Sequence, residues 1–273
     1  MDVNKHIKIL KTLGASASNL MCQSCGLLTP AIGQLGVCHS CESAISMSRD
    51  GMVKRSPDLV AALDGINADI KANRYDEAIA AYEALIKKDQ NPSLVYAEAL
   101  VYMRRSNYEV AQISYDRQGF MEENTEHRNN AARYAAASRL LLNKAASLCN
   151  AALSENEAQG KRYTAFMAYV KLGDYKAARA LLDTMAAGSD GYMHKYAAMV
   201  FCSATGRFDE MLMHAEELSK PDSFSINAFF YIALALLKRR ERKQALRLLA
   251  ALKEHIDSDA IEALEKEAGT GSF

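Results

Sequence analysis

The chain has 273 residues, and 33 Lys and Arg balance 33 Asp and Glu, so no net charge attracts nucleic acid or an anionic membrane to its whole surface. Hydrophobic residues make up 49% and charged residues 24%, the balance of a folded soluble protein and not of a disordered chain. Only four prolines and no Trp are present, which favours long helices over many short strands.

Residues 1–21 form an N-terminal segment in which lysines interrupt MDVNKHIKILKTLG, so it lacks the apolar core of a secretory signal. The longest apolar run, INAFFYIALALL at 226–237, is shorter than the roughly 20 residues that span a bilayer. We therefore expect a cytoplasmic protein without membrane insertion.

Residues 22–41 contain two Cys-x-x-Cys pairs separated by twelve residues, a spacing that resembles a zinc ribbon. In a reducing compartment such pairs indicate a metal site and not disulfides. Four thiolates complete a tetrahedral shell, so we expect a structural zinc ion, with iron as the less favoured alternative. The expected ligands are Cys22, Cys25, Cys38 and Cys41.

The predicted ribbon does not have the composition of a nucleic-acid reader. Its tip, GLLTPAIGQLGV at 26–37, has no cation and no aromatic ring, and such readers use both. Six Lys and Arg against three Asp and Glu give residues 1–56 a charge of 6 − 3 = +3. RNA or DNA contact through Lys5–Lys11 and Lys54–Arg55 is therefore the alternative, and an apolar tip fits protein better.

After a linker at 42–56, Ser56-Pro57-Asp58 has the pattern of a helix start, and Asn91-Pro92 has it again. Six segments then recur at steps of 33 or 34 residues, which is typical of a helical repeat. Their anchor positions are Ala78, Ala111, Ala145, Ala178, Met211 and Ala245. A turn position five residues before each anchor reads Asn73, Ser106, Leu140, Gly173, Gly206 and Arg240.

This pattern, best seen in GDYKAA at 173–178, resembles the tetratricopeptide repeat family over residues 57–254. The resemblance implies an all-α solenoid of about six helix-turn-helix repeats, preceded by the small zinc ribbon. The third and sixth units depart most, because Leu142 and Arg242 replace the ring at the start of the second helix. Residues 255–273 are expected to form a capping helix and a frayed tail.

In such a solenoid the first helix of each pair lines a concave groove, where a protein or peptide partner binds. We expect rings and Met along the groove and cations along one rim. The alternative for each ring is that it packs between neighbouring helices. The predicted groove residues are Lys71, Tyr96, Arg104, Tyr134, Tyr163, Met167, Lys171, Tyr196 and Phe230.

The sequence has no constellation that indicates catalysis. Its six His are scattered, and none is spaced from carboxylates in a pattern that suggests an active site. Cys149 and Cys202 fall on helical core faces, where a thiol behaves as a small hydrophobic side chain. We therefore expect a non-enzymatic interaction scaffold, with the ribbon as a second docking module.

Overall fold

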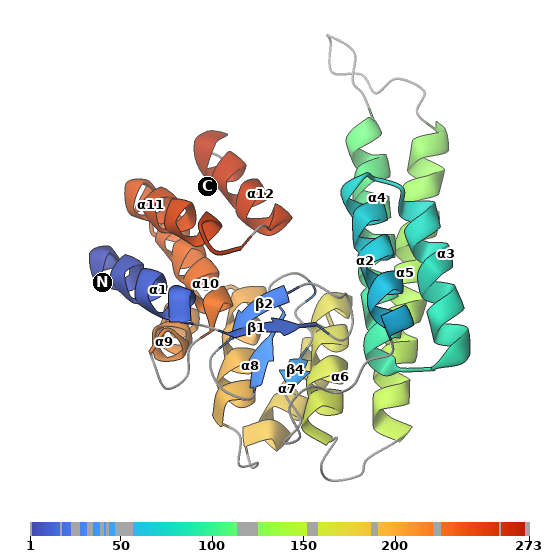
Figure 1. Cartoon of the computed structure of the whole chain (residues 1–273), viewed down its shortest axis with the longest axis horizontal. Coiled ribbons are helices and arrows are strands. Elements are labelled where there is room, and N and C mark those ends of the chain that lie inside the picture. The colour runs from blue at the N-terminus through green and yellow to red at the C-terminus, as the bar shows by residue number, and fades with distance from the viewer. Residues whose placement is uncertain are drawn as a thin grey trace. The chain divides into compact units, whose positions relative to one another are not determined.

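The computed structural model describes residues 2–16, 18–22, 28–31, 35–38, 41, 44–46, 57–113, 125–151, 158–186, 191–220, 225–256 and 258–270. These residues form helices and short strands, most of which Figure 1 labels. The chain divides into two compact units. The central unit comprises residues 24–26 and 55–173, and the terminal unit comprises residues 1–23, 27–54 and 174–273.

The central unit consists of helices that pack in chain order, each against the next. α2 begins at Pro57 as predicted, and α4 begins at Pro92 after Asn91, whose side chain accepts a hydrogen bond of 2.9 Å from the Ser93 amide. The helices are α2 (Pro57–Lys71), α3 (Tyr75–Lys88), α4 (Pro92–Gln112), α5 (Thr125–Ala151) and α6 (Ala158–Leu172).

The helices of the terminal unit also pack in chain order, and the last one forms a cap. Each helix from α7 to α11 packs against the next, and α12 packs on α10 and α11. The all-α fold of serial helix pairs is therefore confirmed, and a helix lies in the predicted cap. The helices are α7 (Tyr175–Ala186), α8 (Gly191–Ala204), α9 (Phe208–Leu218), α10 (Ile226–Lys238), α11 (Arg242–Lys253) and α12 (Asp259–Thr270).

Tight turns join the helices of a pair through one residue in the left-handed conformation. At the α8–α9 turn, Gly206 has φ +74°, its amide bonds the Ser203 carbonyl, and the Arg207 amide bonds the Cys202 carbonyl at 2.8 Å. These two bonds satisfy carbonyls that the end of a helix leaves without partners. The same bonds surround Asn73 and Arg240, and Gly173 also has a positive φ.

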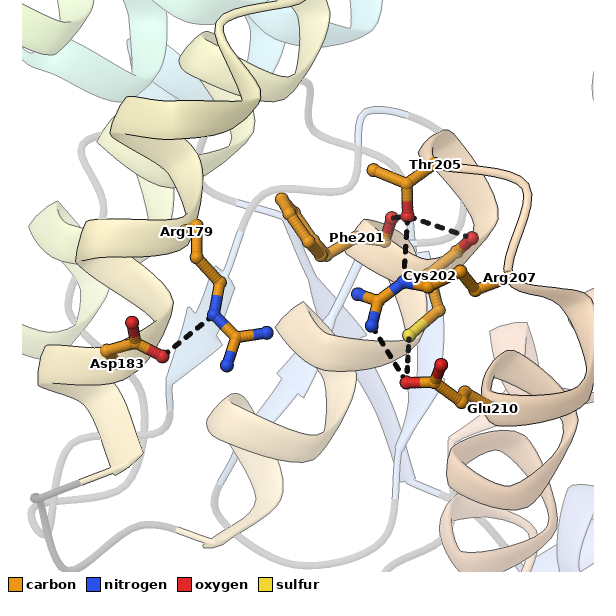
Figure 2. Close-up of polar contacts among 7 residues, drawn as sticks. All are labelled: Arg179, Asp183, Phe201, Cys202, Thr205, Arg207 and Glu210. Carbon is orange, nitrogen blue, oxygen red and sulfur yellow. Dashed lines mark hydrogen bonds and ion pairs between the residues drawn. The ribbon is translucent and has the colours of Figure 1, made fainter.

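Side chains brace the α8–α9 turn, as Figure 2 shows. Thr205 donates to the Phe201 carbonyl at 2.8 Å and accepts from Arg207 Nε at 3.2 Å. Arg207 also pairs with Glu210 at 2.9 Å, and its guanidinium lies 5.3 Å from the centroid of the Phe201 ring. The turn therefore ties the end of α8 to the first turn of α9.

Two predicted turns are absent. α4 continues through Ser106, and α5 continues through Leu140, so the second and third predicted repeats are not separate helix pairs but one long hairpin of α4 and α5. A branched residue such as Leu is disfavoured in the left-handed conformation that the other turns use. Ser106 instead faces inward and donates to the Ala131 carbonyl of α5 at 2.9 Å.

One of the six predicted anchor positions also departs from the repeat pattern. Five of the six have no exposed surface, whereas Ala111 is exposed near the end of α4. Buried anchor side chains mark contacts between helices, and Ala145 is among them although its predicted turn is absent. The buried members are Ala78, Ala145, Ala178, Met211 and Ala245.

The N-terminal segment belongs to the terminal unit and is not a separate body before the repeats. α1 (Val3–Ser16) lies within the predicted segment 1–21 and packs on α10 and α11. Val3, His6 and Leu10 form its buried face, and Arg247 of α11 donates to Asn4 at 2.7 Å. The predicted linker at 42–56 contains a strand, β4 (Ala44–Ser46).

The physical reason for this docking is the composition of α10. Ten of its thirteen residues are buried, so its apolar surface extends around the whole helix. Neighbours in the repeat order cover a helix on only part of its circumference. α1 supplies further cover, because the His6 ring meets the Phe229 ring of α10 edge-on, with centroids 6.3 Å apart.

We predict that Gly206→Ala destabilises the protein by about 1 kcal/mol, because a residue with Cβ strains at positive φ. Its control is Gly65→Ala within α2, which should stabilise by about 0.5–1 kcal/mol because Ala favours a helix. A Cβ at either glycine meets no atom within 4 Å, so backbone conformation alone separates the two. Urea unfolding measures both, and equal shifts would contradict the left-handed turn.

We also predict that Leu10→Ala destabilises the protein by about 3 kcal/mol, because it opens a cavity between α1 and the terminal helices. Leu10 has no exposed surface, whereas Leu140 is 72% exposed. Leu140→Ala should therefore change stability by less than about 0.5 kcal/mol. Thermal melts compare the pair, and a neutral Leu10→Ala would mean that α1 does not dock.

Candidate functional site

The cysteine segment forms two antiparallel β-hairpins. β1 (Ser18–Met21) pairs with β2 (Leu28–Ala31), and β3 (Leu35–Val37) pairs with β4. Cys22 follows β1 directly, and Cys38 follows β3 directly. Cys22 and Cys38 therefore each stand directly after the first strand of one hairpin, and Cys41 lies between β3 and β4 in the chain.

Three of the four predicted ligands lie together. The Sγ atoms of Cys22, Cys38 and Cys41 are all within 4.8 Å of one another, and all three side chains are buried. Cys22 Sγ and Cys41 Sγ are 3.5 Å apart, which is longer than a disulfide bond of about 2 Å. Cys25 lies outside the described residues.

The three sulfurs fit a tetrahedral thiolate site. Zinc–sulfur bonds of about 2.3 Å place the sulfurs of such a shell about 3.8 Å apart. The Cys22–Cys41 distance of 3.5 Å is close to this value, and all three pairs lie within 4.8 Å. Three thiols of this kind, gathered from two hairpins and shielded from water, are typical of a structural site and not of an open catalytic one. Zinc and iron share this ligand set.

One helical side chain connects the cysteine cluster to two helices of the terminal unit. Asn227, at the start of α10, is buried, and its Nδ2 donates to the Cys38 carbonyl at 3.3 Å and to the Tyr196 hydroxyl at 2.8 Å. Tyr196 lies on α8, so two helices meet the cluster through one amide. The sequence analysis missed Asn227, and its signal is a lone amide within the apolar run at 226–237.

Most rings of the predicted groove are enclosed. Buried side chains offer no surface to a partner. At these positions the side chains instead pack within the protein, which is the alternative stated for each ring in the sequence analysis. Tyr134, for example, accepts from Arg133 at 2.9 Å, donates to Asp76 at 3.3 Å and packs its face against Arg105. The five enclosed members are Tyr96, Tyr134, Tyr163, Met167 and Tyr196.

The cations of the predicted groove keep accessible surface. Lys71 and Lys171 are exposed in the last turns of α2 and α6, where a positive charge complements the helix dipole. Arg104 on α4 and Phe230 on α10 are partly exposed. Lys71, Arg104 and Lys171 all belong to the central unit, and Phe230 belongs to the terminal unit.

A charged cluster that the sequence analysis missed braces α4 against α5. Glu109 is buried, its Oε1 lies 2.9 Å from Arg105, and its Oε2 lies 2.6 Å from His127 Nδ1. The i, i+4 spacing of Arg105 and Glu109 is readable in the sequence, whereas His127 comes from the next helix. Its partners occupy both carboxylate oxygens, so this cluster has a structural role.

The two remaining cysteines behave as core side chains. Burial raises the pKa of Cys149 to about 11 and also raises the pKa of Cys202. Figure 2 shows Cys202, whose Sγ lies 3.9 Å from Glu210. A protonated, enclosed thiol is a poor nucleophile and a poor metal ligand, in agreement with the sequence analysis.

The cations predicted for nucleic-acid contact are only partly described. Lys5 and Lys8 are exposed on α1, whereas Lys11 pairs with Glu254 at 3.4 Å. Lys54 and Arg55 lie outside the described residues. Across the part of the chain that the structure describes, no helix combines the length and the apolar character needed to cross a bilayer.

Comparisons with known proteins give no family. No protein-family model matches the chain, and no curated protein matches it significantly. Among solved structures the chain is similar to YrrB, described as "a TPR protein with an unusual peptide-binding site". The match has 16% identity and a TM-score of 0.35, and it covers 75% of this chain and 90% of that one. At this TM-score the likeness carries no argument for function.

Proposed function

We propose that the chain is a non-enzymatic protein-interaction scaffold, in which a structural zinc ion holds the cysteine segment and the helix pairs bind a protein or peptide partner. One observation carries the metal site: three buried sulfurs from two hairpin connections converge within 4.8 Å. Cys22, Cys38 and Cys41, with Cys25 as the fourth ligand, would hold the ion.

Zinc would act on folding and not on chemistry. A bound ion replaces the packing that short hairpins lack, and four thiolates leave no position for water or substrate. The proposal places the protein in the cytoplasm, where reducing conditions keep thiols available for metal. Iron in the same shell stays the alternative.

The partner surface is proposed on the central unit, around the exposed or partly exposed cations of the predicted groove. Lys71, Arg104 and Lys171 are each presented by the first helix of a predicted repeat, and the enclosed rings behind them make the helices a rigid support. Such a surface fits an acidic segment of a protein partner, because opposite charges speed encounter and fix orientation.

We predict that the wild-type chain purifies with about one zinc ion and that Cys38→Ser loses it, because three thiolates bind zinc much more weakly than four. Its control is Cys149→Ser, which changes a buried cysteine of α5 and should keep the metal. Elemental analysis with colorimetric release measures zinc and iron together. Equal metal content in both variants would place the metal elsewhere.

We predict that reversing the groove charges with Lys71→Glu, Arg104→Glu and Lys171→Glu together weakens partner capture from native lysate by at least about tenfold. The matched control reverses Lys87, Lys88 and Lys144, which are also exposed on the central unit, and changes net charge equally. Circular dichroism checks that both fold. Equal capture by both variants would move the interface away from these cations.

A further inference from the structure

We propose that the cysteine site is a metal-dependent latch, in which Asn227 transmits metal occupancy to α8 and α10. This inference rests on the proposed zinc site and goes beyond it, because it assigns a consequence of metal loss to helices far away in the sequence. Cys38 and Asn227 are 189 residues apart, yet their contact is buried.

Asn227 connects the Cys38 main chain to α8 through one side-chain amide. Its side-chain Nδ2 makes two donor contacts, one to the main-chain carbonyl of a proposed ligand and one to the Tyr196 hydroxyl. Tyr196 has no exposed surface, and Asn227 is 6% exposed. Asn227 therefore couples the position of Cys38 directly to two helices.

Separating Cys38 from Asn227 is unfavourable in free energy. If the Cys38 connection moves away, the Asn227 amide loses a buried acceptor, and a buried polar group without a partner costs about 1–3 kcal/mol. Water must then reach Asn227 and Tyr196, which are enclosed when the connection is in place. Metal binding and the closed arrangement of α8 and α10 therefore stabilise each other by linkage.

The docking of α1 provides an internal control for the contacts of Asn227. α1 docks on the same unit through contacts that involve no cysteine: buried Leu10, the Arg247–Asn4 hydrogen bond and the Lys11–Glu254 ion pair. Metal loss should leave these contacts in place. The latch thus opens the neighbourhood of Asn227 while α1 stays docked on α11.

The experiment measures hydrogen–deuterium exchange on the full chain, with zinc and after its removal by a chelator. We expect exchange in α8 and the first turns of α10 to rise about tenfold or more without metal. Exchange in α11 and in α3 of the central unit should change less than twofold. Unchanged exchange in α8 and α10 of a chain that does release zinc would overturn the latch and leave the zinc site standing.

Variants test the role of Asn227 as a positioning residue. Asn227→Ala should keep the zinc stoichiometry but weaken zinc affinity about tenfold, the lower end for a group that orients a ligand. It should also abolish the metal dependence of exchange in α8. Asn4→Ala removes a contact of α1 instead and should behave as wild type.

Tyr196→Phe guards against a general folding defect. It removes one of the two acceptors of Asn227 and keeps both the ring and the Cys38 contact. Metal-dependent exchange should therefore persist in the first turns of α10 and weaken in α8. Zinc affinity that is unchanged in Asn227→Ala overturns the latch. A wild-type chain that binds neither zinc nor iron overturns both the latch and the metal site.

Discussion

The burial of α10 is the constraint on which the terminal unit depends. INAFFYIALALLK carries apolar side chains around its full circumference, and the helices next to it in repeat order cannot cover all of it. The first residues of the chain supply the missing cover through α1, and this fixes where the following hairpins begin. The cysteine cluster lies beside Asn227 because the segment that carries it starts from a docked helix.

The conformation of single turn residues decides where helix pairs exist. Gly206, Asn73 and Arg240 all take positive φ and complete the same pair of terminal hydrogen bonds. The first two are residue types that enter this region readily, and Arg240 shows that the surrounding helices can impose it at some cost. At Ser106 and Leu140 the helix simply continues, which produces the long α4–α5 hairpin of the central unit.

Sequence reasoning recovered what depends on local spacing. The 33- to 34-residue step located the helix pairs outside the α4–α5 hairpin, and the cysteine spacing located three sulfurs that do converge. It did not separate a ring that faces a groove from one between helices, because Tyr163 and Tyr196 have the same pattern in either case. It missed Asn227 and His127 because their partners lie on other elements, and one sequence does not reveal such pairs.

The two units differ in how their sequence is arranged. Residues 55–173 of the central unit are continuous, whereas the terminal unit joins residues 1–23 and 27–54 to those after 173. During synthesis the ribosome therefore releases α1 and the hairpins long before α10, and the entire central unit emerges in between. The apolar face of α1 therefore stays without its final neighbours, α10 and α11, for that interval, and transiently exposed apolar surface of this kind favours aggregation.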